Sequence, residues 1–262
     1  GIVATTNAHG NNITNNTITT NGTGSDDYGI YLTSTVRNSS ISQNIIRTNG
    51  TTDNYGIYLL TTVENTTIIS NTVTTGGSGA SNIGVYLKTL ASNNTITSNT
   101  LVTYGTSSNK GVELISVSND NLIANNVIET HGSSSSNAGV RLVSSVRTNN
   151  ISNNTINTSG TSDNAGILLT STVGNNTVTA NTIRTNGSSN NNYGISLVTN
   201  TNNNTITHNT IMTDGTNGGI GIFLTSIAHY NNISNNTIYT NGTTSNNDGI
   251  LLSTTTDNNK II

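Results

Sequence analysis

Apolar residues recur at fixed places along this chain, and a glycine followed by Ile or Val begins each recurrence. Successive copies are alternately 28 and 27 residues long. Counted from that glycine, the apolar places are the second, fourth, thirteenth and eighteenth, as in Ile167, Leu169, Val178 and Ile183. The repeat glycines are Gly1, Gly29, Gly56, Gly84, Gly111, Gly139, Gly166, Gly194, Gly221 and Gly249. A fixed period of this size is typical of a solenoid.

The spacing inside each copy predicts three short strands and no helix. Residues two apart point to the same face of a strand, and no copy has the 3.6-residue spacing of an amphipathic helix. Similar units running in the same direction form three parallel sheets around one axis, in which each apolar place stacks on itself at about 4.8 Å. Parallel crossovers are right-handed by default. We therefore expect residues 1–262 to form one all-β domain, a right-handed parallel β-helix of about 9.5 coils.

Three further places keep the same residue through the nine full copies. Place 22 is always glycine, which suits close backbone stacking, and place 20 is always Thr, from Thr20 to Thr240, which predicts a column of hydroxyls. Place 16 is always Asn and lies two residues before an inward apolar residue, so we expect its amide to pair with the Asn above and below. This predicted ladder comprises Asn16, Asn44, Asn71, Asn99, Asn126, Asn154, Asn181, Asn209 and Asn236.

The alternation in copy length falls in one loop, after the glycine at place 22. The loop reads 51–55 in one copy and 78–83 in the next. One edge of the solenoid should therefore carry alternating short and long loops, with a practical repeat of 55 residues. Ancestry by duplication of pairs explains this, and a lattice or filament contact at every second coil could use it.

Composition narrows the class of protein. About half of the residues are Asn, Ser or Thr and 7% are charged, which alone suggests disorder, but disordered chains do not keep a register of apolar residues. The chain has no Cys and no Pro, so stacking must stabilise it without disulfides. A net charge of −3 without a basic stripe argues against nucleic acid as a partner. No apolar run approaches the roughly 18 residues of a membrane span, and no signal peptide is seen.

The outward acidic residues do not form a catalytic pair in the sequence. A glycosidase needs two carboxylates within roughly 5–10 Å, whereas here the acids fall at different places or in distant coils, so we expect no catalytic residues and no enzyme. Two charge pairs are expected between neighbouring coils at the surface, Glu113 with Arg141 and Arg37 with Glu64. The acids considered are Glu64, Glu113, Glu129, Asp120 and Asp257.

Metal sites have little support. His9, His131, His208 and His229 lie in separate coils without ligand spacing. The loop acids Asp26 and Asp27 lie one coil from Asp53 and could hold calcium, although turn formation is the ordinary use of Asp in such loops. We expect no other cofactor.

Tyrosines mark a second surface feature. Tyr31, Tyr58 and Tyr86 occupy the outward third place of three successive coils, and Tyr28 and Tyr55 lie just before the repeat glycine. An aromatic ladder can contact a glycan, and it can equally stabilise the sheet.

N-glycosylation sequons are numerous, but composition alone predicts as many. They cluster at places 10, 12, 15 and 21, which alternate with inward places and should face solvent. The candidates are Asn12, Asn15, Asn21, Asn38, Asn49, Asn65, Asn93, Asn150, Asn153, Asn157, Asn175, Asn186, Asn203, Asn232, Asn235 and Asn241.

The segments 93–101 (NNTITSNTL) and 175–183 (NNTVTANTI) resemble the parallel β-helix repeats of the pectate-lyase-like superfamily, and especially the NosD-type repeats of archaeal cell-surface proteins, methanogens in particular. The resemblance covers the whole chain and implies a right-handed β-helix and an exported protein. The copper role associated with NosD finds no ligand set here, and the charged active-site clusters of the lyases are missing.

Two functions remain open. A parallel stack exposes unpaired backbone groups at each end, and we see no capping segment before Gly1 or after Ile262. We therefore expect a segment or subunit of a larger assembly, a self-assembling structural protein of a cell-surface sheath, surface layer or filament. The alternative is a carbohydrate-binding or adhesin module that uses Tyr31, Tyr58 and Tyr86. Ice binding through outward threonines has weaker support, because Arg47, Glu129, Arg184 and Met212 interrupt the threonine array.

Overall fold

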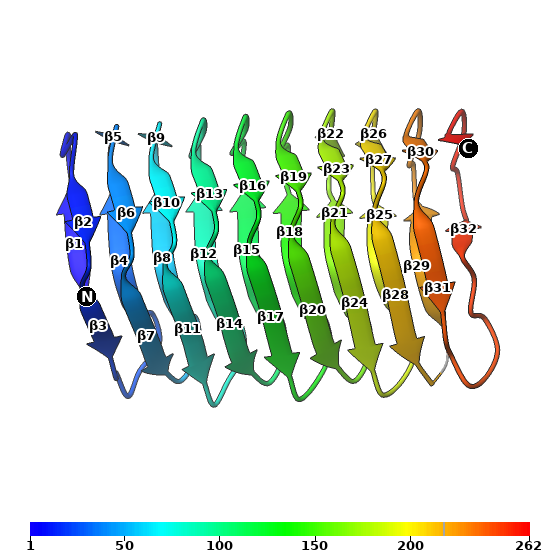
Figure 1. The fold of residues 1–262 in the computed structure, drawn as a ribbon, viewed down its shortest axis with the longest axis horizontal. Coiled ribbons are helices and arrows are strands. Elements are labelled where there is room, and N and C mark those ends of the chain that lie inside the picture. Colours follow the sequence, from blue (N-terminus) through cyan, green and yellow to red (C-terminus); the bar gives the residue numbers. More distant parts are fainter. Residues whose placement is uncertain (217) are drawn as a thin grey trace.

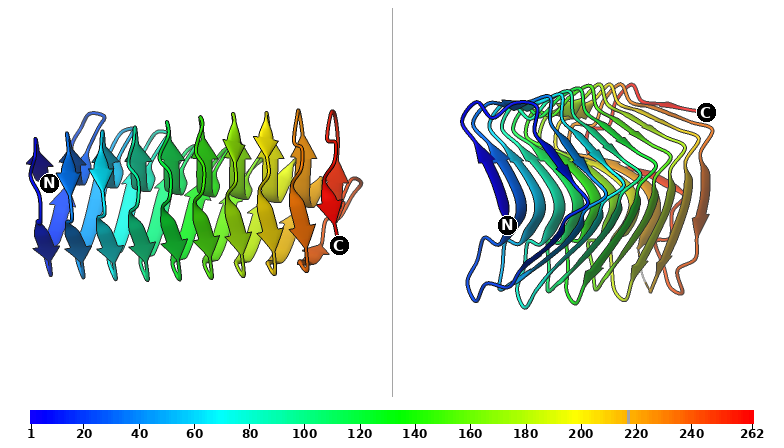
Figure 2. Two further views of the ribbon diagram at one scale, coloured as in Figure 1. Left: turned by 90° about the horizontal axis from the view of Figure 1, so that it is seen from above. Right: turned by 60° about the vertical axis from the view of Figure 1, so that its left-hand side comes forward.

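Each coil contributes one strand to each of three parallel sheets, and the coils stack from one end of the chain to the other (Figure 1). The computed structural model describes residues 1–216 and 218–262, in which every regular element is a strand. Adjacent strands in each sheet come from successive coils. The N- and C-termini therefore lie at opposite ends of the stack (Figure 2). The predicted right-handed parallel β-helix with three strands in each coil is confirmed.

The first sheet begins at or near the repeat glycine of each coil and has ten strands. They are β1 (Ile2–Thr5), β4 (Tyr28–Thr33), β8 (Tyr55–Leu60), β12 (Ile83–Lys88), β15 (Lys110–Ile115), β18 (Ala138–Val143), β21 (Ala165–Thr170), β25 (Asn192–Val198), β29 (Gly219–Thr225) and β32 (Ile250–Leu252).

The second sheet carries the thirteenth place and also has ten strands. They are β2 (Asn12–Thr14), β6 (Ser40–Ser42), β10 (Thr67–Ile69), β13 (Thr95–Thr97), β16 (Leu122–Ala124), β19 (Asn150–Ser152), β23 (Thr177–Thr179), β27 (Thr205–Thr207), β30 (Asn232–Ser234) and β33 (Lys260–Ile261).

The third sheet carries places 17 to 22 and has nine strands. They are β3 (Thr17–Thr20), β7 (Ile45–Gly50), β11 (Thr72–Gly77), β14 (Thr100–Gly105), β17 (Val127–Gly132), β20 (Thr155–Gly160), β24 (Thr182–Gly187), β28 (Thr210–Gly215) and β31 (Thr237–Thr240). Two short ladders at a corner complete the set: β5 (Val36–Arg37) with β9 (Val63–Glu64), and β22 (Val173–Gly174) with β26 (Thr201–Asn202).

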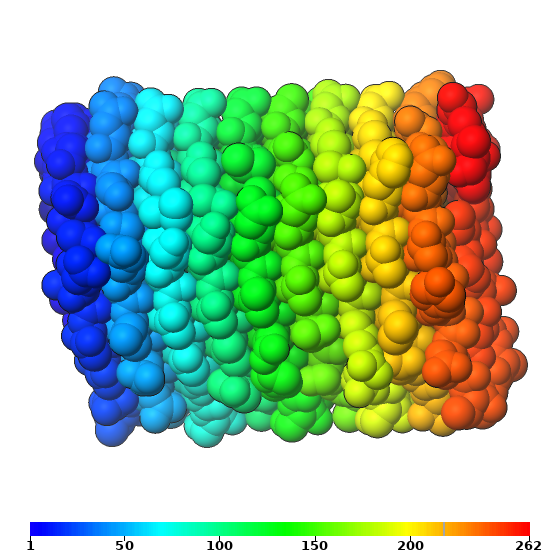
Figure 3. All heavy atoms as spheres, in the orientation of Figure 1, coloured from blue at the N-terminus to red at the C-terminus, as the bar shows by residue number. Residues whose placement is uncertain are grey.

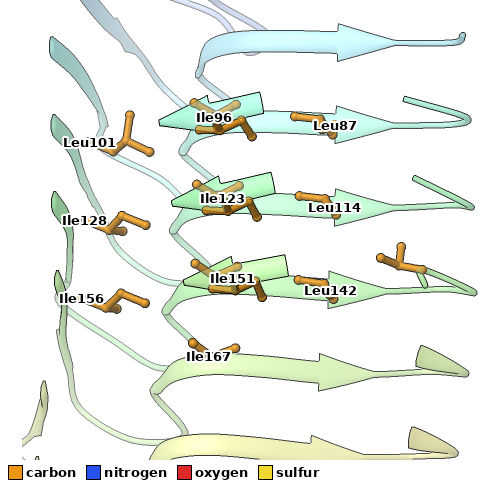
Figure 4. Close-up of a cluster of buried hydrophobic side chains, with 14 of the residues drawn as sticks. Leu87, Ile96, Leu101, Leu114, Ile123, Ile128, Leu142, Ile151, Ile156 and Ile167 are labelled. Atoms are coloured by element: carbon orange, nitrogen blue, oxygen red, sulfur yellow. The ribbon is translucent and has the colours of Figure 1, made fainter. Parts of the chain in front are cut away.

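The core consists of aliphatic columns that run along the axis. Figure 4 shows Leu87, Leu114 and Leu142 one above another, opposite similar columns from the second and third sheets. The register is that of the repeat, since Leu114 pairs with both Leu87 and Leu142. A further buried column at the eighth place, which includes Val36, Val63 and Ala91, was not predicted. The eighth place escaped notice because Ser118 and Thr201 interrupt its apolar pattern.

The corners explain the polar composition. Every full coil has non-glycine residues with φ between 46° and 71°, in the left-handed region. Asn, Asp, Ser and Thr fill most of these positions, because their short side chains bond to the local backbone and Asn and Asp tolerate this conformation best. Pairs such as Ser34–Thr35 and Ser144–Ser145 turn the chain after each strand of the first sheet from β1 to β29. The abundance of small polar residues is therefore a requirement of tight corners.

A ladder of asparagines directly precedes the strands of each of the three sheets. The ladder predicted from Asn16 to Asn236 precedes the third sheet, and each Nδ2 donates to the Oδ1 of the next coil at 2.9–3.0 Å. Two other ladders were missed. One precedes the second sheet and comprises Asn94, Asn121, Asn149, Asn176, Asn204, Asn231 and Asn259. The other precedes the first sheet and comprises Asn54, Asn82, Asn109, Asn137, Asn164 and Asn192.

The threonine column at place 20 does not behave as the asparagine ladders do. Thr48, Thr75, Thr103 and Thr130 point inward and are buried, but their hydroxyls have no hydrogen-bond partner among the described residues. Successive hydroxyls repeat at the strand spacing of about 4.8 Å, which is too long for a hydrogen bond. An amide spans that gap because it places a donor and an acceptor on opposite sides of one group.

The predicted alternation of loop length is present. Four residues, 51–54, connect β7 to β8, whereas five residues, 78–82, connect β11 to β12. Figure 3 shows each coil as one band of atoms that lies directly against the next. None of the described residues belongs to an apolar helix of membrane-spanning length.

Candidate functional site

The predicted tyrosine ladder forms on the outer face of the first sheet, with its rings stacked against one another. The centroids of Tyr31 and Tyr58 are 5.1 Å apart, and those of Tyr58 and Tyr86 are 4.9 Å apart with an interplanar angle of 8°. Tyr28 and Tyr55 extend the cluster sideways. Tyr58 is 5% exposed and Tyr86 is 7% exposed. The ring faces that a sugar would stack on are therefore largely covered by neighbouring tyrosines, so the geometry favours a sheet-stabilising role.

Burial also controls the acidity of this cluster. It raises the pKa of Tyr28 from 10.0 to about 12, and the Asp26 carboxylate adds to the shift. Burial likewise raises the pKa of Tyr55, with the Asp53 carboxylate as the next cause, and the pKa values of Tyr58 and Tyr86. These hydroxyls stay protonated at neutral pH, and those of Tyr28 and Tyr55 donate hydrogen bonds to Asp26 and Asp53.

A charged cluster follows the tyrosines along the same face. Arg141 Nη1 donates to Glu113 Oε1 at 2.6 Å, and the Glu113 side chain is only 5% exposed. Lys110 is also buried, and its Nζ donates to the carbonyl of Ser108 at 2.5 Å. Burial lowers the pKa of Lys110, and the Glu113 carboxylate partly opposes that shift. The Glu113–Arg141 pair is therefore more buried than the surface pair that the sequence suggests, whereas Arg37 and Glu64 form a more open pair at 2.8 Å.

The candidate calcium ligands do not converge. Asp27 Oδ2 accepts a hydrogen bond from the backbone N of Gly22 at 2.6 Å, while Asp26 contacts the Tyr28 hydroxyl at 3.3 Å. Asp53 lies beside Tyr55, whose hydroxyl is 3.5 Å from Asp53 Oδ1. Across residues 1–216 and 218–262, no three His, Asp or Glu side chains gather in a way that could hold a metal ion. These aspartates serve the turns and the tyrosine cluster instead.

The outer face of the third sheet carries a feature that the sequence analysis missed. Three hollows, of about 410, 260 and 540 Å³, lie along it. In the first, Tyr104 is 48% exposed and stacks on His131 with centroids 5.2 Å apart. The sequence contains the relevant residues at place 21, where Tyr104 lies one coil after Gly76. The other residues at place 21 are mostly polar, so this place shows no repeating pattern that would draw attention to Tyr104.

The glycosylation candidates lie where the sequence places them. Fourteen of the sixteen asparagines are exposed, and the other two, Asn157 and Asn232, are partly buried. Their modification remains a prediction.

Comparison with known proteins supports the fold and the family. Residues 1–131, half of the chain, match the family described as "Periplasmic copper-binding protein (NosD)". No curated protein sequence matches the chain. DFA-IIIase from Arthrobacter chlorophenolicus A6, solved in complex with DFA-III, superposes with a TM-score of 0.65 at 14% identity, over 97% of this chain and 64% of that one.

A phage protein shares the fold as well. The enzymatically active domain of bacteriophage CBA120 tailspike protein 2 superposes with a TM-score of 0.56 at 15% identity, over 92% of this chain and 38% of that one. The chain therefore spans less than two thirds of each of these structures. At such low identity the likeness is one of fold.

These structures correct one expectation. From the scattered acidic residues we predicted that the chain is not an enzyme. This prediction is contradicted, because DFA-IIIase and the tailspike domain are enzymes that share this fold. The prediction compared only acidic residues with one another. It paired Glu113 with Arg141 but did not consider the buried Lys110, which lies in the same strand as Glu113 and interacts electrostatically with both.

Copper does not fit the side chains that are present. Copper sites use His, Cys and Met ligands, and the chain has no Cys and one Met. His131 lies 3.5 Å from Glu129, and His229 lies 3.9 Å from Asp257, but no third ligand joins either pair among the described residues. We therefore assign no chemistry to a metal.

Proposed function

Because the chain belongs to the NosD family of parallel β-helix proteins, we propose that it is a rigid scaffold of the cell surface that assembles with copies of itself. On this proposal residues 1–262 are one solenoid domain, used as a segment or repeating subunit of a sheath, surface layer or filament. The family description as periplasmic agrees with an exported protein.

The continuity of the ladders carries this proposal. Asn99, Asn126 and Asn154 are linked to one another by amide hydrogen bonds of 3.0 Å, and the aliphatic columns beside them are fully buried. Each coil is thus fixed to the next through the backbone, the amides and the core at once. A mechanical element needs such resistance to bending and to separation of its coils.

The loop alternation supports assembly. The four-residue and five-residue loops give the rod a surface period of two coils, or about 9.6 Å at the usual strand spacing. Neighbouring rods could then make the same contact repeatedly along their length. Repetition strengthens a weak contact, because each further contact forms at high effective concentration.

Electron microscopy of the purified chain and of native material tests the scaffold. We expect fibres or flat lattices whose repeat along the rod is a multiple of the two-coil spacing, and whose amount increases with protein concentration. Particles that stay single at every concentration would remove the support for self-assembly. Intact mass of the native protein decides whether the exposed sequons carry glycans.

A second candidate is carbohydrate binding, and the half-exposed ring of Tyr104 favours it. Exposed aromatic rings beside polar groups are typical of ligand pockets, and the Tyr104 hollow has this character. Sedimentation with insoluble polysaccharides separates this candidate from a purely mechanical role. Retention on a polysaccharide by single particles favours binding, and assembly without retention favours the scaffold.

A further inference from the structure

Gly76 in β11 is a glycine that the fold does not require. Its φ is outside the left-handed region, and a Cβ atom added to it would lie 3.9 Å from both Asn49 Oδ1 and Tyr104 Cβ. Those are ordinary van der Waals separations. By contrast, a Cβ on Gly139 would lie 2.7 Å from the carbonyl oxygen of Gly166 and would collide with Ile156. Packing therefore demands glycine at 139 and leaves it unexplained at 76.

The missing side chain opens one face of an aromatic ring. Gly76 pairs with Asn49 in the preceding coil, and Tyr104 occupies the same place in the coil that follows. The ring of Tyr104 stacks on His131 on one side, with an interplanar angle of 19°. On the other side, where a side chain of residue 76 would lie, the chain has only hydrogen. This is the difference from Tyr58, whose ring is stacked between Tyr31 and Tyr86.

The hollow in front of this ring is lined by polar side chains and by an arginine, Arg47, that forms no ion pair with a described residue. Its volume is about 410 Å³, and its lining includes Arg47, Asn49, Gly76 and Tyr104. Three of the five arginines, Arg37, Arg141 and Arg184, are paired with carboxylates. Arg47 forms no ion pair with any described residue and is exposed at the hollow.

We propose that this hollow is a subsite for a pyranose ring that carries an acidic group, with Tyr104 as the stacking platform and Arg47 as the partner of the acid. An aromatic face takes the apolar face of a sugar ring, and a guanidinium matches a carboxylate or sulfate with two parallel hydrogen bonds. Asn49 supplies an amide for the sugar hydroxyls. The inference rests on carbohydrate binding, the second candidate function, and moves its site from the tyrosine ladder to the third sheet.

The position of Tyr104 also suggests how a polysaccharide chain would lie. The two other hollows continue along the same face and include His131 with Arg184 and Met212 with Tyr239. Successive coils repeat at about 4.8 Å, so an extended chain parallel to the rod would meet the same places in each coil. Gly76 then leaves space on the outer surface for a sugar ring between the side chains of Asn49 and Tyr104, which flank it in the preceding and following coils.

Binding of short oligosaccharides to the whole chain, measured by calorimetry, tests the subsite. The probes are oligomers of a polyuronate, of a sulfated glucan and of a neutral glucan. Tyr104→Ala and Gly76→Val, which fills the hollow, should each weaken binding of the acidic probes by about tenfold or more. Arg47→Gln should remove the preference for the acidic probes over the neutral one.

Matched variants control for surface changes. Tyr230→Ala removes another exposed tyrosine, and Asn150→Val places valine at an exposed strand position of the second sheet, away from the three hollows. Neither should alter binding. Gly76→Val adds a β-branched residue to a partly buried, outward-facing strand position with room for a Cβ atom, so it should keep the fold intact, and circular dichroism verifies this.

The outcomes are distinguishable. Undiminished binding by Tyr104→Ala and Gly76→Val overturns the subsite and leaves carbohydrate binding elsewhere on the chain. Equal affinity for neutral and acidic probes in the parent chain overturns the role of Arg47. No binding of any probe overturns both the subsite and the second candidate function. If the acidic probes bind, the tighter of the two, polyuronate or sulfated glucan, identifies whether the subsite recognises a carboxylate or a sulfate.

Discussion

Asn99 donates its side-chain amide to Asn126 Oδ1 at 3.0 Å, and the same oxygen accepts the backbone N–H of Asn99 at 2.9 Å. Asn126 in turn donates to Asn154 and to the carbonyls of Ile96 and Ala124. One side chain thus satisfies donors and acceptors of three coils, so the amide serves as a connector that no apolar residue can replace.

Replacing Asn126 with Ala should therefore be costly. The change leaves the backbone N–H of Asn99 and the carbonyl of Ile96 buried without these partners, and we expect a loss of about 2–4 kcal/mol in unfolding free energy. Guanidinium denaturation provides the measurement. Asn157→Ala, on the outer face of the third sheet, is the control and should stay within about 0.5 kcal/mol of the parent. Equal effects of the two changes would show that the ladder contributes nothing special.

Replacing Thr130 with Val should have the opposite sign. The Thr130 hydroxyl is buried without a hydrogen-bond partner among the described residues, and valine has nearly the same shape. Removing an unpaired buried hydroxyl should raise the unfolding free energy by about 1 kcal/mol. The same denaturation experiment applies. A loss of stability would mean that the hydroxyl is satisfied, for example by an ordered water molecule.

Two glycine substitutions should separate a packing requirement from a free position. Gly139→Ala forces a Cβ against Ile156 and the Gly166 carbonyl, and we expect it to cost about 2 kcal/mol or more. Gly76→Ala meets only contacts of 3.9 Å, so it should be neutral or stabilising by up to about 1 kcal/mol. Thermal unfolding of both variants compares them directly. The prediction fails if Gly76→Ala destabilises the chain as much as Gly139→Ala.

The tyrosine cluster should make stability fall at high pH. Since the folded state raises the pKa of Tyr28 from 10.0 to about 12, the folded state holds the proton more tightly than the unfolded state. The resulting contribution is fully present below pH 10.0 and is lost as the pH rises towards about 12. Unfolding midpoints measured across this window should fall less steeply for Tyr28→Phe than for the parent. Parallel pH profiles would contradict a raised pKa.

Much of the fold was readable because the repeat fixes both spacing and direction. Ile, Leu or Val at four places identifies the strands and the inward face, and the invariant Asn at place 16 predicts the first ladder. The other ladders were missed because their places vary: Ser39 and Thr66 stand where later coils have Asn94 and Asn121, and Asp27 stands where later coils have Asn54.

The candidate sites were harder to predict, since they depend on which ring faces remain open. The sequence shows that Tyr31, Tyr58 and Tyr86 align, but not that alignment at 4.9–5.1 Å covers their faces. Conversely, one face of the Tyr104 ring is uncovered because Gly76, at the same place in the preceding coil, has no side chain. A search for similar residues at one place does not detect a missing side chain. It also missed Lys110, which lies at a different place from the predicted pair Glu113 and Arg141.

The three asparagine ladders all donate in one direction, from each coil to the one that follows it in sequence, as Asn16 does to Asn44, Asn54 to Asn82 and Asn94 to Asn121. Their amide dipoles therefore add instead of cancelling, as peptide dipoles do in a helix. The rod acquires an electrical polarity, and a suspension of such rods should align in an applied field, which electric birefringence would detect.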